Sequence, residues 1–298
     1  MFKNVIMYNI APGWDAQAAQ IEACLQAGHF VECGASQEKS IGWIEPRGEA
    51  NGPLLEVVAN QWLLKLMIES RALPASVVNR KAQERVAQIE AATGRKPGKK
   101  ETRDIKDDLR LELLPMAFTK QSSVLIWFNR EDQYVVIDAA SQNRADEVVT
   151  LLVQILPGLA LTLVNTKTSP STAMADWLVT QEAPAGFSVD RECELKAPDE
   201  SKAVVRYTRH RLDTDEVKQH VEGGKVPTRL ALTWSDRVSF VLTQDLQLKK
   251  LAFLEVVFEG ASAGKDDGFD ADVALSTGEL RKMLPDVLDT LGGQVALT

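Results

Sequence analysis

The residues best suited to chemistry in this sequence are basic side chains gathered between positions 204 and 234. They are Arg206, Arg209, Arg211, Lys218, Lys225 and Arg229. Two of the acids among them, Asp215 and Glu216, fall in the first turn of an expected helix, where the helix dipole favours negative charge. The run 208–211, which includes His210, therefore keeps a positive surplus. It is either a solvated strand end or a phosphate-binding rim, because guanidinium groups on a rigid sheet edge match phosphate oxygens.

A second basic group occupies residues 95–100, Arg-Lys-Pro-Gly-Lys-Lys, which contain four bases and no acid. The run is either a solvated turn or a finger that contacts a nucleic-acid backbone. Residues 94–100 are too short for a phosphate-binding loop, lack Ser or Thr and follow a helix, which excludes that kind of nucleotide site. The candidate phosphate contacts are Arg206, Arg209, His210, Arg211, Lys225 and Arg229 in the first group, and Lys96, Lys99, Lys100 and Lys120 in the second.

Two enzyme motifs near the C-terminus are weak. Residues 260–264, Gly-Ala-Ser-Ala-Gly, match a nucleophile elbow, but all three histidines precede them, which excludes the Ser-Asp-His order. Asp266, Asp267, Asp270 and Asp272 could bind two metal ions for phosphodiester cleavage, with the last two expected at a strand entry. Since no partners for these carboxylates can be assigned, a metal-dependent nuclease is a minor alternative.

Cys24, His29 and Cys33 lie close together in the sequence and raise the question of a metal site. Their spacing matches no zinc pattern, and no fourth ligand lies nearby. Packing explains them better, and an odd count of three cysteines indicates reduced thiols. We therefore expect no catalytic residue, no metal and no cofactor.

Local signals define the elements that position the first basic group. Residues 203–207 predict a strand, and Asp213 is expected to cap a helix, with Glu216 completing a capping box. Gly223 and Gly224 end that helix. Residues 229–234 predict a second strand, with Leu230, Leu232 and Trp234 on one face.

The whole chain predicts an α+β fold of mostly antiparallel sheets with packed helices, since its β-α-β-β opening argues against a doubly wound parallel sheet. Apolar residues at helical spacing predict a helical hairpin insertion over residues 74–115, with the basic run 95–100 at its tip. We expect an N-terminal lobe from residues 1–73 and 116–168, and a C-terminal lobe from 169–298. Residues 184–198, rich in Pro, acids and small residues, are the best candidate for a boundary between lobes. A last helix is expected over residues 279–291, started by Ser276 or Thr277.

Bulk properties fit a globular intracellular protein. The sequence is 45% hydrophobic and 26% charged. Its net charge of −8 disfavours nucleic-acid binding by itself, although an acidic exterior around a basic channel would satisfy both observations. We find no signal peptide and no apolar run long enough to span a bilayer, so we expect a soluble cytoplasmic protein without membrane contact.

Several strings, taken in order, resemble the bacterial recombination-associated protein RdgC family. They are Phe-Lys-Asn at 2–4, Gly-Trp at 42–43, Leu-Leu-Pro-Met-Ala-Phe at 113–118, Phe-Asp-Ala-Asp at 269–272, Thr-Gly-Glu-Leu at 277–280, and the basic segment itself. The resemblance covers essentially the whole chain. It implies a non-enzymatic protein that binds DNA without sequence preference, forms a ring-shaped homodimer around duplex DNA in the nucleoid, and restrains RecA-dependent recombination.

The resemblance also implies roles for particular residues. The family's matching Phe lies at a dimer contact that closes the ring, a role that passes to Phe118, with Met116 beside it. A second Phe often follows in the family, but Gln121 takes its place here, which predicts a weaker or differently packed contact. Positions matching Arg209 and His210 face the central hole.

Two alternatives stay open beside this interpretation. The basic groups could bind an acidic protein partner, which would make the protein an interaction adaptor, or the chain could be the metal-dependent nuclease considered above. Salt dependence separates DNA binding from the adaptor function. Single-stranded DNA is an alternative ligand to duplex, and the sequence leaves open whether RecA is contacted directly.

Overall fold

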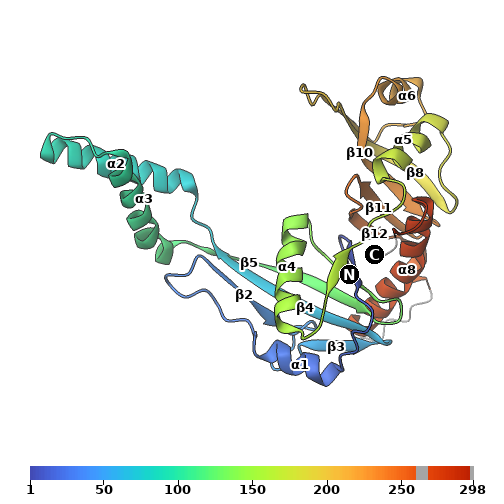
Figure 1. Ribbon diagram of the computed structural model, residues 1–298, viewed down its shortest axis with the longest axis horizontal. Coiled ribbons are helices and arrows are strands. Elements are labelled where there is room, and N and C mark those ends of the chain that lie inside the picture. The colour runs from blue at the N-terminus through green and yellow to red at the C-terminus, as the bar shows by residue number, and fades with distance from the viewer. Residues whose placement is uncertain (260–267, 296–298) are drawn as a thin grey trace.

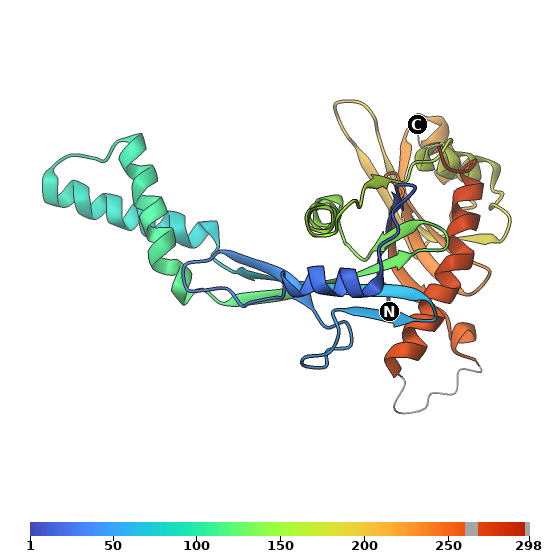
Figure 2. The same cartoon turned by 60° about the horizontal axis from the view of Figure 1, so that its bottom comes forward.

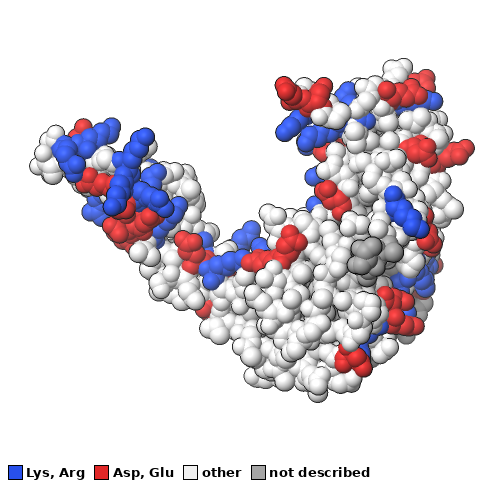
Figure 3. All heavy atoms as spheres, viewed as in Figure 1, with Lys and Arg blue, Asp and Glu red and all other residues white. Residues whose placement is uncertain are grey.

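A computed structural model describes residues 1–259 and 268–295, which form a U (Figures 1 and 2). A helical arm makes one side of the U, a sheet with two helices makes its base, and a second sheet with its helices makes the other side. A hollow separates the arm from the second sheet (Figure 3). No helix among the described residues combines the length and apolar character needed to cross a bilayer.

The base of the U is a seven-stranded sheet in which the paired strands are antiparallel. Its strands are β1 (Ile6–Ile10), β2 (Lys39–Ile44), β3 (Leu55–Val58), β4 (Gln61–Arg71), β5 (Thr119–Asn129), β6 (Tyr134–Ile137) and β7 (Leu161–Leu163). They run in the order β2-β4-β5-β6-β1-β7, with β3 paired to β4. Helices α1 (Ala18–Gln26) and α4 (Gln142–Ile155) bury their apolar stripes in the core of this lobe.

The helical hairpin predicted from apolar spacing is present as the arm. It consists of α2 (Ala75–Thr93), α3 (Lys99–Leu113) and a short 3-10 helix η1 (Leu114–Met116). Gly94 ends α2 with a φ of 69°, a left-handed conformation that glycine adopts without strain. Few arm residues are buried, and the arm projects from the end of β4 and β5 (Figure 1).

The second sheet carries the first basic group. Its strands are β8 (Phe187–Lys196), β9 (Val204–Thr208), β10 (Val226–Trp234), β11 (Val238–Thr243) and β12 (Leu248–Phe253). They run in the order β12-β11-β10-β8-β9, again antiparallel. The accompanying helices are α5 (Pro170–Thr180), α6 (Asp215–Glu222), α7 (Glu255–Phe258) and α8 (Gly268–Thr290). The prediction of an α+β fold with antiparallel sheets is confirmed.

The start of the chain joins the two sheets. The amide of Val5 donates to the carbonyl of Leu248 at 2.8 Å, and the amide of Leu248 donates back to Val5 at 3.0 Å. Phe2, Val5 and Met7 share a core cluster with the second sheet and α8. This buried joint holds one side of the U on its base.

The expectation of a boundary at residues 184–198 is wrong. Residues Phe187–Lys196 form β8, which pairs with both β9 and β10 inside the second sheet. The polar residues that suggested a linker alternate with Cys193 and Leu195, both buried. Alternation of this kind belongs to a strand with one face in the core.

The expected start of the helix in the basic segment is also wrong. α6 begins at Asp215 with Thr214 as its N-cap residue, and no side chain caps it. The side chains proposed for capping have other partners: Asp213 binds Arg211, and Glu216 accepts a hydrogen bond of 2.8 Å from the hydroxyl of Tyr207.

The last helix starts well before Ser276. Phe269, Asp270 and Asp272 lie in α8, so the expected strand entry at these residues is wrong. Ser276 and Thr277 sit buried inside the helix, where their hydroxyls donate to the carbonyls of Asp272 and Val273. Such bonds within the helix satisfy hydroxyls that would otherwise compete with it.

Candidate nucleic-acid interface

The first basic group reaches from the edge strand β9 of the second sheet to its central strand β10. β9 is the last strand in the order, and β8 separates it from β10. Glu194 of β8 stands opposite Arg206 of β9 on one side and opposite Arg229 of β10 on the other. The three side chains form a row on one face, because directly paired residues point to the same side of a sheet.

This row keeps a positive surplus of one charge. The Nε of Arg206 donates to Glu194 at 2.5 Å, and the hydroxyl of Thr228 donates to the same carboxylate at 2.7 Å. Burial acts to raise the pKa of Glu194, but these hydrogen bonds and the charge of Arg229 hold it below its ordinary value. The carboxylate therefore stays ionised and fixes Arg206 in place, while Arg229 is left exposed.

Arg209 occupies a turn at the end of β9. Its φ of 55° is left-handed, a conformation that costs a non-glycine residue about 1 kcal/mol. The turn is held by the amide of His210, which donates to the carbonyl of Arg191 at 3.1 Å. The His210 ring also packs near the Tyr207 ring, with their centroids 5.3 Å apart. The Arg209 side chain is exposed and belongs to no ion pair among the described residues. A strained turn that presents a free cation fits a binding role.

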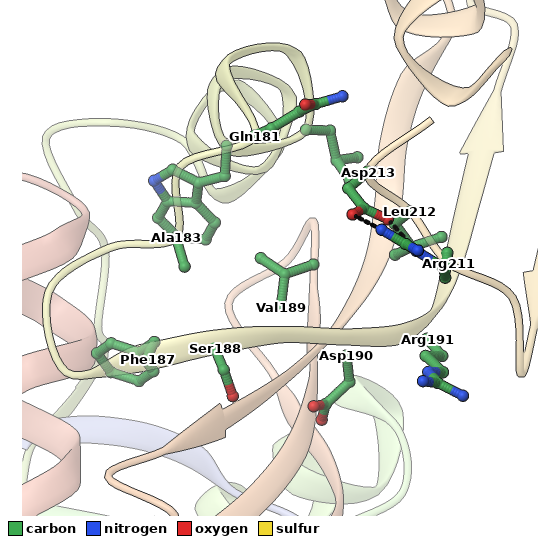
Figure 4. A pocket seen from close by; sticks show the side chains of 12 residues that line it. Gln181, Ala183, Phe187, Ser188, Val189, Asp190, Arg191, Arg211, Leu212 and Asp213 are labelled. Carbon is green, nitrogen blue, oxygen red and sulfur yellow. Dashed lines mark hydrogen bonds and ion pairs between the residues drawn. The ribbon is translucent and has the colours of Figure 1, made fainter. Parts of the chain in front are cut away.

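Arg211 is less available than its neighbours. Its Nε and Nη2 donate to the two carboxylate oxygens of Asp213 at 2.9 and 2.5 Å (Figure 4). The hydrogen bond from Arg211 lowers the pKa of Asp213, and the same bond raises the pKa of Arg211. The pair lines a cavity of about 400 Å³ beside β8 and the end of α5. A phosphate would have to displace Asp213 to reach this guanidinium.

Lys225 is also engaged. It is half-buried, and its Nζ lies 3.1 Å from the Nδ1 of His220. The ammonium group of Lys225 therefore already has one partner on α6. Within the first group, Arg209 and Arg229 are therefore the cations best placed to meet a ligand.

The second group sits on the arm. Lys96, Lys99 and Lys100 belong to the junction where α2 meets α3, and Arg95 pairs there with Glu101 at 2.9 Å. The two basic groups lie on opposite sides of the U, so a single chain does not bring them together (Figures 1 and 3). Lysine and arginine side chains gather on the arm and on the end of the second lobe that faces it.

Lys120, Phe118 and Met116 lie where the arm joins the base. Lys120 is exposed on β5 opposite Ser70. Phe118 is 88% exposed and Met116 69% exposed, so neither belongs to the core. Neighbouring exposed apolar side chains can form the kind of patch that marks a protein contact, and these two lie two residues apart.

Sequence reasoning missed Glu194 and Arg191, which define the surroundings of the basic strand end. Glu194 neutralises part of the Arg206–Arg229 row, and Arg191 supplies the carbonyl that holds the Arg209 turn. The alternation of polar residues with Cys193 and Leu195 was the available signal, but the Pro, acidic and small residues of 184–198 suggested a linker.

No group of three or more His, Cys, Asp or Glu in the described ranges is arranged to hold a metal ion. Cys33 is buried and Cys24 half-buried, both as free thiols. Asp270 instead pairs with Arg47 at 2.5 Å. The candidate motif at 260–264, with Asp266 and Asp267, lies outside the described residues.

Comparison with known proteins gives one consistent result. Residues 1–294 match the family model described as "RdgC: Putative exonuclease, RdgC". The chain is 42% identical over 300 residues to a protein of Dechloromonas aromatica, covering 99% of this chain and 98% of that one. It is 43% identical over 296 residues to a protein of Cupriavidus pinatubonensis, covering 98% of each. Both relatives are named "Recombination-associated protein RdgC".

Proposed function

This chain belongs to the RdgC family of recombination-associated proteins, and from that premise we propose that it binds duplex DNA without sequence preference. Two copies form a ring that encloses the duplex in the nucleoid. Occupancy of the DNA then restrains RecA-dependent recombination. In this proposal the protein acts by binding and carries no catalytic residue.

The observation that carries the proposal is the open U with basic side chains on both of its sides (Figure 3). A duplex lying in the hollow would meet Arg209 and Arg229 on one side and the lysines of the arm tip on the other. Contacts of this kind reach phosphate oxygens, which supply affinity and no sequence information. An acidic protein with cations facing a channel also reconciles DNA binding with a net charge of −8.

Ring closure requires a self-complementary surface, and Phe118 with Met116 offers one. A two-fold contact places the same patch of both copies together. Burying two exposed apolar side chains from each copy would stabilise the dimer through the hydrophobic effect. In this arrangement the hollow of one U faces the hollow of the other.

The test is binding of a labelled duplex across a salt series for the wild type and for Arg209→Ala/Arg229→Ala. We expect the variant to bind more weakly and its log–log salt slope to fall by about one unit for each phosphate that it no longer neutralises. The control is Lys282→Ala, a cation on α8, which lies on the far side of the second lobe from the hollow (Figure 1). Equal binding by wild type and Arg variant at every salt concentration would remove the second sheet from the interface.

The word exonuclease in the family description makes strand cleavage the competing function. An end-labelled duplex incubated with the protein and Mg²⁺ separates the two, because a binding protein leaves its length unchanged. Progressive shortening would replace the present proposal with a nuclease. Absence of duplex binding even at low salt would instead favour the adaptor function.

A further inference from the structure

A single arginine ties the arm to the base of the U. Arg71 is the last residue of β4, and each of its five N–H donors has a backbone carbonyl as acceptor. Its Nη1 donates to Leu114 at 3.4 Å and to Ala117 at 3.2 Å. Its Nη2 donates to Cys33 at 3.1 Å and to Gly34 at 3.2 Å, and its Nε donates to Gly34 at 3.3 Å.

The carbonyls on the arm side belong to the turn that presents the exposed apolar residues. Leu114 begins η1, which contains Met116, and Ala117 and Phe118 follow it directly. The amide of Ala72, next to Arg71, donates to the carbonyl of Phe118 at 2.7 Å. Arg71 and Ala72 therefore bind the backbone of this turn, while its two apolar side chains point into solvent.

The carbonyls on the base side are fixed by a second charged residue. Glu69 lies two positions before Arg71, on the same face of β4. Its carboxylate accepts the amide of Cys33 at 2.5 Å and the side-chain amide of Gln121 at 3.1 Å. Gln121 thus supports the same joint from β5, at the position where the family resemblance predicted a second Phe. Glu69 anchors the loop at Cys33, and Arg71 connects that loop to the arm.

We propose that Arg71 is the positioning residue that holds Met116 and Phe118 in the geometry needed for self-association. This inference rests on the proposed dimer contact. A turn held by several bonds keeps two exposed side chains in one arrangement, so association loses little conformational freedom. Lysine cannot substitute fully, because an ammonium group is a single point without the planar fork of guanidinium.

The first experiment measures the dimer dissociation constant by sedimentation equilibrium. We expect Phe118→Ala and Arg71→Gln each to weaken self-association by about tenfold or more, with Arg71→Lys between Arg71→Gln and the wild type. The matched control is Arg103→Gln, which removes the same charge from an exposed site on α3. It should dimerise as the wild type does.

The outcomes separate the two proposals. If Phe118→Ala dimerises normally, the proposed contact itself is wrong. If Phe118→Ala weakens the dimer while both Arg71 variants match the wild type, the contact stands and the role of Arg71 is overturned.

A local readout guards against general unfolding. Hydrogen exchange is followed in Phe118→Ala protein with and without Arg71→Lys. We expect faster exchange at Ala72 and Ala117, whose amides donate to Phe118 and Leu114, and unchanged exchange in the buried strand residues Ile126 and Trp127. Unchanged exchange at Ala72 and Ala117 would also overturn the inference, whereas faster exchange throughout would assign Arg71 to overall stability instead.

Discussion

Individual charged residues in this protein either hold the fold or face solvent, and their partners decide which. Glu279 of α8 is 5% exposed and accepts two bonds from Arg237, at 2.6 Å from Nε and 2.9 Å from Nη2. The hydrogen bond from Arg237 lowers the pKa of Glu279 against the opposing effect of burial. This pair joins α8 to the second sheet, whereas Arg209 has no such partner among the described residues and can bind a ligand.

The Glu279–Arg237 pair predicts a pH-dependent stability. Because the folded pKa of Glu279 is depressed, its contribution is complete above the unfolded pKa of about 4.3. This contribution to stability is lost as the pH falls through the lower pKa that Glu279 has in the folded protein, since the unfolded chain binds the proton first. We expect Glu279→Gln to lower the free energy of unfolding by about 2 kcal/mol at pH 7. The difference in free energy of unfolding between variant and wild type should narrow below about pH 4. Urea unfolding at several pH values measures this.

Asp107→Asn provides the comparison for that experiment. Asp107 belongs to exposed pairs with Arg103 and Arg110 on α3, and such pairs contribute well under about 1 kcal/mol. Its loss should leave the unfolding midpoint nearly unchanged. A gap between Glu279→Gln and wild type that stays constant down to about pH 3 would contradict the assignment of the stability to an ionised Glu279.

At the scale of elements, two glycines of the family-like strings have opposite surroundings. A Cβ on Gly42 of β2 would lie 2.4 Å from the Cα and 2.6 Å from the amide nitrogen of Phe30. The backbone of Phe30 sits this close because its amide donates to Trp43 at 2.9 Å. Gly278 lies inside α8, and a Cβ there would meet nothing within 4 Å among the described residues.

Alanine substitutions at these two glycines should therefore have opposite effects. Gly42→Ala forces backbone atoms apart, and we expect a loss of about 2 kcal/mol or more. Gly278→Ala removes a flexible residue from a helix interior, and we expect a gain of about 0.5–1 kcal/mol. Thermal and urea unfolding of both variants provide the measurement. If neither substitution changed the free energy of unfolding, β2 and the segment at Phe30 would be able to move apart without loss of stability.

At the scale of the whole molecule, the important property is that the U is open within one chain. Its two basic groups lie on opposite sides of the hollow, and the apolar residues Met116 and Phe118 lie where the arm leaves the base (Figure 1). Under the proposed function, a single chain would therefore contact a duplex from two directions but would not surround it. Enclosure requires the second copy.

Enclosure has a kinetic consequence that phosphate contacts alone do not have. A closed ring leaves linear DNA by sliding off an end, whereas it must open to leave a closed circle. We expect the wild type to dissociate more slowly from a circular plasmid than from the same plasmid linearised, at matched salt. Phe118→Ala should abolish this difference while retaining the salt dependence that the phosphate contacts produce.

Dissociation after a high-salt or competitor challenge measures the effect, and Arg103→Gln serves as the control on the same arm. Equal lifetimes of the wild type on circular and linear DNA would exclude a closed ring and leave binding in an open hollow.

The sequence by itself determined what depends on neighbours along the chain. Apolar spacing identified the helices of the arm, and the basic run 95–100 fell at their junction, because helical periodicity is a local property. Alternating residues likewise identified the strands at residues 203–207 and 229–234, which the structure has as β9 and β10. The antiparallel α+β class followed from the order of these elements.

Only the tertiary structure decided which charges are paired and which apolar residues stay exposed. Arg206 and Arg229 share Glu194 because β8 lies between their strands. The spacing of residues along one segment does not predict the register in which it pairs with a distant segment. Phe118 would be assigned to the core on its type alone, yet it is 88% exposed, because its carbonyl is bound by the amide of Ala72, directly after β4, while its side chain points outward. Burial and ion pairing depend on contacts between remote segments, and those contacts exist only in the folded chain.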